Sequence, residues 1–383
     1  MIEYGKHTID KNDYLSIKKV LASGFLTQGD KVKIFEKNFS VITNSKFSQS
    51  FNSCTSALIA SCMTLGLKKN DIVWTTPNSF VASSNCALIC GAKVEFIDID
   101  AQSYNMSIFE LEKKLLKTKK KFLPKIVISV HFAGLPNQQE NIWKLSKKYK
   151  FKILEDCCHA LGSSYKNNLM GNCRWSDIAV FSFHPVKAIT TGEGGMATTN
   201  LKKYKEKLSL IASHGINKNK KKFKKKKRPG WYYEQVSIGF NFRMSDIQAA
   251  LGIVQLSKLN KFIKIRNKIA NFYFRNLKNL PINLPIGSNK EILNAFHIFV
   301  VRFKNKLMRN KIYELLLKNK IRCGYHYIPI YKQPYYHDKF KGKCKEMEKY
   351  YEDALTLPIY PLLKLNVQKK IIFLIKRFLK KNF

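Results

Sequence analysis

Two side chains that could share one chemical task stand at the ends of apolar runs in this sequence. Residues 153–162 (ILEDCCHALG) place Asp156 directly after one run, and residues 181–187 (FSFHPVK) lead from another run to Lys187. A glycine-rich stretch, residues 192–195 (GEGG), follows the lysine. An amine that is partly withdrawn from water can act as a nucleophile, and a carboxylate can hold a cationic group.

This pair of groups matches what pyridoxal 5'-phosphate (PLP) requires from a protein. PLP needs an amine for a Schiff base and an anion that faces its pyridinium nitrogen. We therefore expect Lys187 to bind PLP covalently and Asp156 to keep the ring nitrogen protonated. Simpler interpretations stay open, since a single lysine in this lysine-rich chain is usually a solvated surface group, and Asp156 could cap a helix.

A phosphate-binding segment should accompany such a pair, and residues 52–58 (NSCTSAL) are a candidate. Small hydroxyl residues precede an apolar helix there, and the free N–H groups at a helix start favour an anion. An ordinary helix N-cap has the same appearance. The sequence contains no GxGxxG motif after a first strand, which argues against an NAD-dependent oxidoreductase.

The elements that must position these residues alternate between two patterns in the first two thirds of the chain. Apolar, β-branched runs predict strands at residues 72–76, 93–99, 125–130, 151–155, 178–183 and 196–199. Helical patterns lie between them at residues 55–65, 83–90, 107–116, 138–149 and 201–214. This alternation predicts a layered α/β domain with a largely parallel sheet, where ligands bind at the carboxyl ends of strands.

The last third of the chain predicts a second domain. Residues 245–277 contain no proline and one glycine, which indicates a single long helix that leaves the first domain. Beyond it, residues 296–303, 315–322 and 325–334 and a basic helix at 367–380 suggest a smaller α+β domain. We therefore expect a large domain over residues 1–257 and a small domain over residues 258–383.

Composition limits the class of protein. With 383 residues and 45% apolar content, the chain can bury a large core. Its nine cysteines show no metal-ligand spacing, so we expect no metal site and reduced thiols in a cytoplasmic protein.

The first ten residues include Glu3, Lys6 and Asp10 and lack the apolar core of a secretory signal. Residues 72–92 carry no charge but are interrupted by Pro77, which favours a strand, a turn and a helix over a membrane span.

The formal net charge is +43, and residues 218–228 contain nine basic positions out of eleven. Lysine is spread over nearly every predicted helix, which indicates a general compositional bias on solvated faces. The basic run predicts a surface loop, and an alternative role for it is to attract a polyanion such as a nucleotide diphosphate. We expect no nucleic-acid partner.

Taken together, these segments resemble the DegT/StrS family of PLP-dependent nucleotide-sugar aminotransferases, which have the aspartate-aminotransferase fold. The resemblance spans nearly the whole chain. It also rests on residues 75–80 (TTPNSF), 94–98 (VEFID), 131–134 (HFAG), 213–215 (SHG) and 239–246 (GFNFRMSD). Several ordered segments at matching spacing are more specific than any one of them.

The resemblance implies a role for each candidate cofactor residue. Lys187 would form the Schiff base and then shuttle a proton, and Asp156 would hold the pyridine nitrogen. Phe80 would stack on the ring face, and His159, where many members have glutamine, would lie near the phenolic oxygen. The phosphate would be bound by the backbone of Cys54, by Thr55 and by Ser182.

The resemblance also implies a homodimer with shared active sites, because Asn241 matches a family residue that reaches the partner's cofactor phosphate. Substrate would be contacted by Thr27, His184 and His326. For His326, in residues 325–329 (YHYIP), an ordinary strand histidine is the alternative. Some family members are dehydratases that carry histidine in place of the lysine, so Lys187 favours transamination.

Within the family the resemblance is closest to aminotransferases of pseudaminic acid biosynthesis that act on UDP-linked keto sugars. Residues 26–29 (LTQG), 130–134 (VHFAG) and 181–191 (FSFHPVKAITT) carry it. It implies L-glutamate as the donor and a UDP-linked 2-acetamido-2,6-dideoxy-4-keto-hexose as the acceptor. The alternatives are another dTDP- or UDP-linked 4-keto sugar, or a non-catalytic regulator with this fold. The basic run at residues 218–228 is longer and more charged than in relatives.

Overall fold

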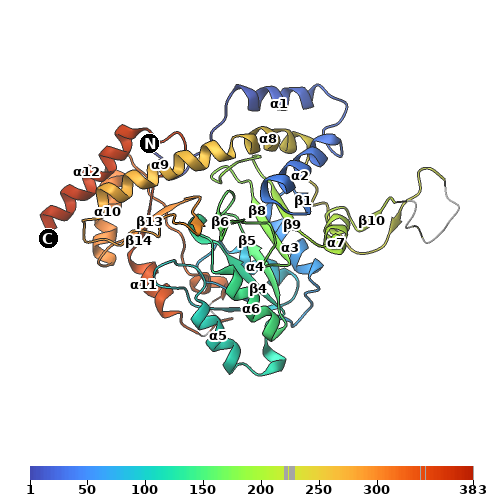
Figure 1. Cartoon of the computed structure of the whole chain (residues 1–383), viewed down its shortest axis with the longest axis horizontal. Coiled ribbons are helices and arrows are strands. Elements are labelled where there is room, and N and C mark those ends of the chain that lie inside the picture. The colour runs from blue at the N-terminus through green and yellow to red at the C-terminus, as the bar shows by residue number, and fades with distance from the viewer. Residues whose placement is uncertain (220–222, 224–228, 337, 341, 383) are drawn as a thin grey trace.

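The computed structural model describes residues 1–219, 223, 229–336, 338–340 and 342–382 (Figure 1). Its centre is a seven-stranded sheet with the order β1-β9-β8-β5-β4-β2-β3. Strands β3, β2, β4, β5 and β8 are parallel, whereas β9 is antiparallel to both β8 and β1. The bounds are β1 (Phe47–Phe51), β2 (Ile72–Thr75), β3 (Lys93–Phe96), β4 (Ile126–Val130), β5 (Lys152–Asp156), β8 (Ile178–Ser182) and β9 (Gly195–Thr199). The predicted layered α/β domain with a largely parallel sheet is confirmed.

Helices cover both faces of this sheet, and the strand sequences explain why. Ile126 and Ile128 of β4 pack with one set of helices, whereas Val127 between them packs with another set. Successive side chains of a strand point to opposite faces, so this strand, in which all five residues are buried, requires cover on both sides. The first set contains α3 (Cys54–Thr64), α4 (Ala82–Ile89) and α7 (Lys202–Ala212), and the second contains α5 (Ile108–Lys117) and α6 (Gln139–Tyr149).

Residues 245–277 form two helices, so the prediction of a single long helix over this range is wrong. Helix α8 (Asp246–Ser257) ends and α9 (Leu259–Leu277) begins at Lys258, whose amide bonds the carbonyl groups of Gln255 and Leu256. The Lys258 ammonium lies 2.7 Å from an Asp10 carboxylate oxygen and 2.6 Å from one of Asp13. The N-terminal segment therefore holds the break in place, although neither glycine nor proline marks it.

Two N-terminal helices that sequence analysis did not predict pack against α8. They are α1 (Lys11–Leu21) and α2 (Asp30–Thr43) (Figure 1). Helix α1 begins with a capping box in which Asp10 and Asp13 bond each other's backbone amides. Phe35 and Phe39 of α2 are fully buried and contact Phe183, which follows β8. Helix α2 therefore fixes the chain that leads out of the central sheet.

The C-terminal part has its own apolar core around a two-stranded antiparallel sheet. Strands β13 (Phe299–Arg302) and β14 (Ala354–Leu357) pair there, and α9, α10 (Lys306–Lys318) and α12 (Leu365–Asn382) pack around them. Helix α11 (Lys345–Asp353) leads into β14, and residues 325–329 are irregular. The domain boundary after residue 257 stays a prediction. The shorter elements are β6 (Ser164–Tyr165), β7 (Asn168–Leu169), β10 (Ile216–Asn217), β11 (Glu234–Gln235) and β12 (Ile292–Leu293).

Two sequence predictions concern surfaces and membranes. The uncharged residues 72–92 form β2, a turn and α4, as predicted. In the part of the chain that the structure describes, each helix is too short or too polar to cross a membrane. Most of the basic run at residues 218–228 lies outside the described residues.

Candidate active site

A cavity of about 430 Å³ lies where β5 and β8 end and α3 begins. Most of the predicted site residues line it, although they come from distant parts of the sequence. They are Cys54, Thr55, Phe80, Asp156, His159, Ser182, His184, Lys187 and His326. Thr27 and Asn241 are not among the residues that line it. The structure thus brings most of the predicted residues together, and their individual roles stay predictions.

Lys187 enters this cavity from the turn that follows β8. Its backbone amide donates to the carbonyl of His184 at 2.9 Å, which closes the turn. The side chain is half-buried, and its amine has no hydrogen bond or ion pair with any described residue. An amine in this state can react with a group that enters the cavity. The amine of a lysine on a solvated helix face would not meet such a group.

Asp156 is the last residue of β5, and its side chain is buried. Ser83 of α4 donates to its Oδ2 at 2.7 Å, and the amide of Cys158 donates to its Oδ1 at 3.1 Å. No helix follows directly, so Asp156 is not a helix cap. Among the described residues it has no cationic partner. A buried carboxylate held only by neutral donors is costly, so this position favours a cation such as a protonated pyridine nitrogen.

The start of α3 provides donors for an anion beside these two groups. Ser53 caps the helix and accepts the amide hydrogen of Ser56 at 3.1 Å. Within the described structure the amides of Cys54 and Thr55 have no backbone acceptor. A Cβ atom on Gly195 would lie 2.5 Å from the Ser53 carbonyl oxygen and 2.6 Å from the Cys54 nitrogen, so β9 starts in direct contact with the helix end. The Ser53 cap thus leaves the amides of Cys54 and Thr55 available to an anion.

His159 forms one wall of the cavity as a neutral imidazole. Burial first, and then the nearby charges of Lys187 and His326, hold its pKa well below its usual range. Its Nδ1 accepts the amide hydrogen of Ala133 at 3.2 Å, so Nε2 carries the proton and donates to the Tyr327 hydroxyl at 3.0 Å. His159 is therefore a hydrogen-bond donor toward the cavity wall.

Three further predicted side chains that line the cavity are those of His326, His184 and Phe80. His326 lies in the irregular segment rather than in a strand, and its Nδ1 is 2.9 Å from the Thr356 hydroxyl. Burial first, and then Lys187, lower the pKa of His326 to about 3. His184 and Phe80 are exposed, and the Phe80 ring centroid lies 6.5 Å from that of Tyr327.

Thr27 and Asn241 lie on the surface outside the cavity. Thr27 is exposed in a loop that Asp246 anchors. The Asp246 carboxylate accepts the amide hydrogens of Gly29 and Lys31 at 2.8 and 2.9 Å. Asn241 is also exposed, and its carbonyl accepts a hydrogen bond from the Asn52 side chain at 3.3 Å. Neither side chain lines the cavity of the chain to which it belongs.

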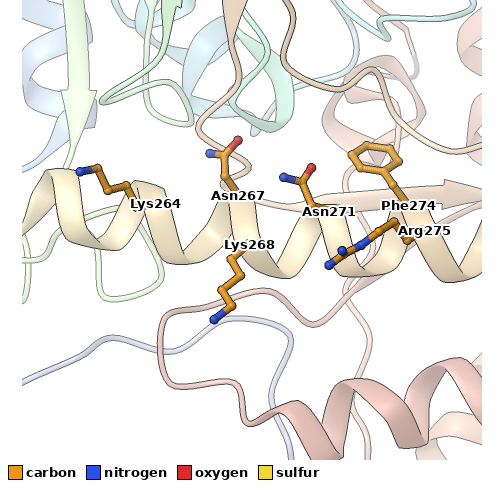
Figure 2. A pocket seen from close by; sticks show the side chains of 6 residues that line it. All are labelled: Lys264, Asn267, Lys268, Asn271, Phe274 and Arg275. Carbon is orange, nitrogen blue, oxygen red and sulfur yellow. The ribbon is translucent and has the colours of Figure 1, made fainter.

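A larger but shallower depression, of about 570 Å³, lies along α9. Six side chains of this one helix line it, and Figure 2 shows Lys268 directed away from Asn267 and Asn271. Because its polar groups do not converge on a common point, this depression lacks the features of a specific ligand site.

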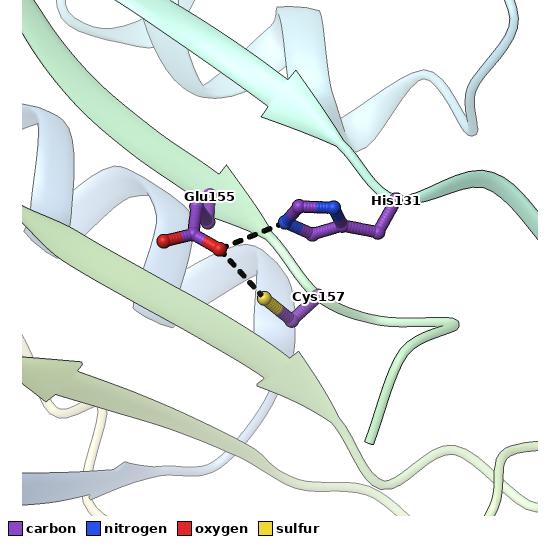
Figure 3. A group of neighbouring side chains, drawn as sticks. All are labelled: His131, Glu155 and Cys157. Carbon is purple, nitrogen blue, oxygen red and sulfur yellow. Dashed lines mark hydrogen bonds and ion pairs between the residues drawn. The ribbon is translucent and has the colours of Figure 1, made fainter. Parts of the chain in front are cut away.

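Three buried side chains behind Asp156 have metal-ligand types, namely His131, Glu155 and Cys157 (Figure 3). The His131 Nδ1 accepts the amide hydrogen of Asn137 at 3.0 Å, so its Nε2 donates to Glu155 Oε2 at 2.8 Å. The Cys157 thiol donates to the same oxygen at 3.8 Å. Burial, followed by the charge of Glu155, raises the pKa of Cys157 well above its usual range, so it stays a thiol.

These three groups are thus committed to one another as a hydrogen-bonded cluster. The amide of His131 also donates to the backbone carbonyl of Asp156 at 3.1 Å. The cluster therefore fixes the end of β5 and positions Asp156 from behind, instead of offering free ligand atoms.

Several cavity residues were not identified from the sequence. Ser83 is a hydroxyl residue in a small, uncharged helix, and its only signal is that it lies within the uncharged run of residues 72–92. Tyr327 adjoins the predicted His326 and could have been included with it. Tyr4 and His297 line the cavity from distant positions, and no local pattern marks them.

The whole chain is similar to aminotransferases. A sequence model of the DegT/DnrJ/EryC1/StrS aminotransferase family matches residues 7–376. The UDP-4-amino-4,6-dideoxy-N-acetyl-beta-L-altrosamine transaminase of Campylobacter jejuni subsp. jejuni serotype O:2 is 34% identical over 390 residues, which cover 100% of both chains.

Solved structures agree with this similarity. The structure of Helicobacter pylori PseC, an aminotransferase involved in the biosynthesis of pseudoaminic acid, superposes with a TM-score of 0.89 at 32% identity and covers 99% of each chain. The PMP-form of the sugar aminotransferase Spr1654 from Streptococcus pneumoniae has a TM-score of 0.91 at 25% identity over 100% of each chain.

Proposed function

Since the chain belongs to the DegT/DnrJ/EryC1/StrS family of aminotransferases, we propose that Lys187 and Asp156 hold its cofactor between them. Membership confirms the predicted family, the aspartate-aminotransferase-like fold and the class of PLP-dependent transaminase. One observation carries the assignment of residues. An amine and a buried carboxylate, neither of which has an oppositely charged partner among the described residues, line the same cavity.

In this proposal each group performs one task. Bound PLP supplies an electron sink for the bond that breaks at Cα of the amino donor. The Lys187 amine binds the cofactor and carries the proton that leaves Cα. Asp156, held by Ser83 and the amide of Cys158, keeps a positive charge on the ring nitrogen. The start of α3, with Cys54 and Thr55, binds the phosphate through its amides, and Ser182 adds a hydroxyl.

We propose L-glutamate as the amino donor and a UDP-linked 2-acetamido-2,6-dideoxy-4-keto-hexose as the acceptor. The name of the Campylobacter relative supports this sugar class. The cavity is also lined by neutral polar groups, His326 and Tyr327, that suit hydroxyl and carbonyl groups of a sugar. Transfer to C4 would yield the 4-amino sugar.

We also propose that two copies of the chain form the active unit. Asn241 and Thr27 are exposed and lie outside the cavity of their own chain, and the segments that carry them or adjoin them in sequence also expose large apolar side chains. Large exposed apolar side chains often mark contacts between protein chains, so a second copy of the chain is the proposed cover for them. In this arrangement Asn241 reaches the phosphate in the partner's cavity. The apolar residues are Phe25, Leu26, Trp231, Ile238 and Phe240, which are 37 to 79% exposed.

A two-stage assay tests the proposed reaction. The purified protein with PLP should lose its visible absorbance band when L-glutamate is added, and the band should return with the correct keto sugar. A panel of UDP- and dTDP-linked 4-keto sugars identifies the acceptor. Recovery with only a dTDP-linked sugar would contradict the proposed substrate but retain the enzyme class, whereas no response to glutamate would contradict the donor.

A further inference from the structure

Two thiols face each other in the wall of the cavity. The sulfur atoms of Cys54 and Cys158 are 3.1 Å apart, although 104 positions separate them in the sequence. Both cysteines are half-buried and line the cavity, so a small molecule that enters the cavity can reach them. A second close pair, Cys62 and Cys86, has its sulfur atoms 3.8 Å apart and is fully buried away from the cavity.

We propose that Cys54 and Cys158 are a site of reversible oxidation, at which a disulfide links the start of α3 to the segment after Asp156. A disulfide has an S–S distance of about 2.05 Å, so the sulfur atoms need to approach by about 1 Å. Neither segment has to unfold for a movement of this size, because the two sulfur atoms are already in contact.

The oxidation balances with hydrogen peroxide as the oxidant. One thiolate attacks an oxygen of the peroxide, which forms a sulfenic acid and, after protonation, one water molecule. The second thiol then attacks the sulfenic sulfur, forms the S–S bond and releases a second water molecule. Two thiols are oxidised and one peroxide is reduced to two water molecules. A dithiol reductant returns both thiols by exchange.

The neighbouring Cys157 does not share this position. Its side chain is buried and its thiol donates to Glu155 on the other side of the strand. Cys158 remains a thiol at rest, because its hydrogen bond with Cys54 and its burial raise its pKa well above the usual range. Attack by the Cys158 sulfur should therefore be slow at neutral pH, and the cross-link should form only when an oxidant is added.

The proposed cofactor site predicts that PLP protects this pair. The Cys54 amide belongs to the proposed phosphate site, and the Cys158 amide holds Asp156. A cofactor bound between these points would cover both sulfur atoms. The expected protection rests on the proposed function, whereas formation of the disulfide in cofactor-free protein does not.

Peptide mapping of the full-length protein tests the proposal. Cofactor-free and PLP-loaded samples are treated with hydrogen peroxide, the remaining thiols are blocked, and digests are analysed by mass spectrometry under non-reducing conditions. We expect a cross-link between Cys54 and Cys158 that dithiothreitol reverses, with Cys62 and Cys86 still reduced. PLP at saturation should slow its formation by about tenfold or more.

Matched variants assign the sulfur atoms. Cys158→Ser should abolish the cross-link, whereas Cys157→Ser should retain it. A cross-link through Cys157, or over-oxidation of single thiols with no cross-link, would overturn the proposal. Equal rates with and without PLP would support the thiol pair but contradict the proposed position of the cofactor.

Discussion

The hydroxyl of Ser83 on α4 donates to Oδ2 of Asp156 at 2.7 Å, so a helix outside the strand holds this buried carboxylate. Ser83→Ala should destabilise the cofactor-free protein by about 1.5–3 kcal/mol, which is the typical value of a hydrogen bond to a charged group. Denaturant unfolding measures the change.

A double-mutant cycle is the control for this prediction. In an Asp156→Asn background the charge is gone, so the effect of Ser83→Ala should fall below about 1 kcal/mol. An equal effect in both backgrounds would mean that Ser83 acts through packing.

The Lys187 amine has no partner among the described residues, so its loss should affect chemistry more than folding. Lys187→Ala should remove the visible absorbance band of covalently bound PLP and lower transamination by about 100-fold or more. Lys187→Arg should fail in the same way, because a guanidinium offers no neutral amine. Lys166→Ala removes a surface lysine that pairs with Glu140 and should retain both properties.

The lowered pKa of His326 predicts a pH dependence of stability. A histidine in an unfolded chain has a pKa of about 6.5, whereas burial lowers that of folded His326 to about 3. Between these values the unfolded chain binds a proton that the folded protein does not, so stability falls as the pH falls from 6.5 towards 3.

His326→Gln should remove this contribution, which is up to about 1.4 kcal/mol for each pH unit. Denaturant unfolding at pH 7 and at pH 5 measures the slope. His7→Gln, which removes an exposed histidine, is the matched control. Identical slopes for the His326 variant and the unaltered protein would contradict the burial argument.

Mixed dimers test the proposal that Asn241 contacts the cofactor phosphate in the cavity of a second copy of the chain. Lys187→Ala and Asn241→Ala homodimers should each be impaired. In a mixed dimer, one site combines an intact Lys187 with an intact Asn241 from the other subunit. Random exchange of subunits should therefore restore about a quarter of the normal activity. If Asn241 acts within its own chain, mixing restores nothing.

Gly195 marks the contact between β9 and the start of α3. Gly195→Ala would place a Cβ atom 2.5 Å from the Ser53 carbonyl oxygen and must displace the helix start. We expect the affinity for PLP to fall by at least about tenfold, because a loss of about 1.4 kcal/mol in binding free energy is enough for a tenfold change. Titration of PLP measures it. Gly230→Ala, where no described residue beyond the chain neighbours comes within 4 Å of the added Cβ, should bind PLP normally.

The sequence was sufficient to predict that Asp156 and Lys187 lie near each other, because Asp156 ends one buried strand, Lys187 follows another, and the carboxyl ends of parallel strands share one edge. Ser83 escaped detection because a serine in a small, uncharged helix looks the same whether or not it faces a carboxylate. Tyr4 and His297 reach the cavity only through tertiary packing. Their positions depend on the whole fold and leave no local pattern.

The fold, like the site, could be predicted only in part from the sequence. The alternation of apolar strands and helices indicated the parallel part of the sheet, but β9 reads like any short buried strand, and its antiparallel direction follows from its pairing with β8 and β1. The break at Lys258 depends on Asp10 and Asp13, which lie more than 240 positions away. No window of local sequence contains that information.

The backbone amide of Ala133 gives the hydrogen bonds beside the cavity a single direction. It occupies Nδ1 of His159, which leaves Nε2 to donate to the Tyr327 oxygen. The phenol must then point its own hydrogen elsewhere. The Tyr327 hydroxyl can therefore donate to an acceptor on a molecule in the cavity, so this wall recognises ligands by polarity as well as by shape.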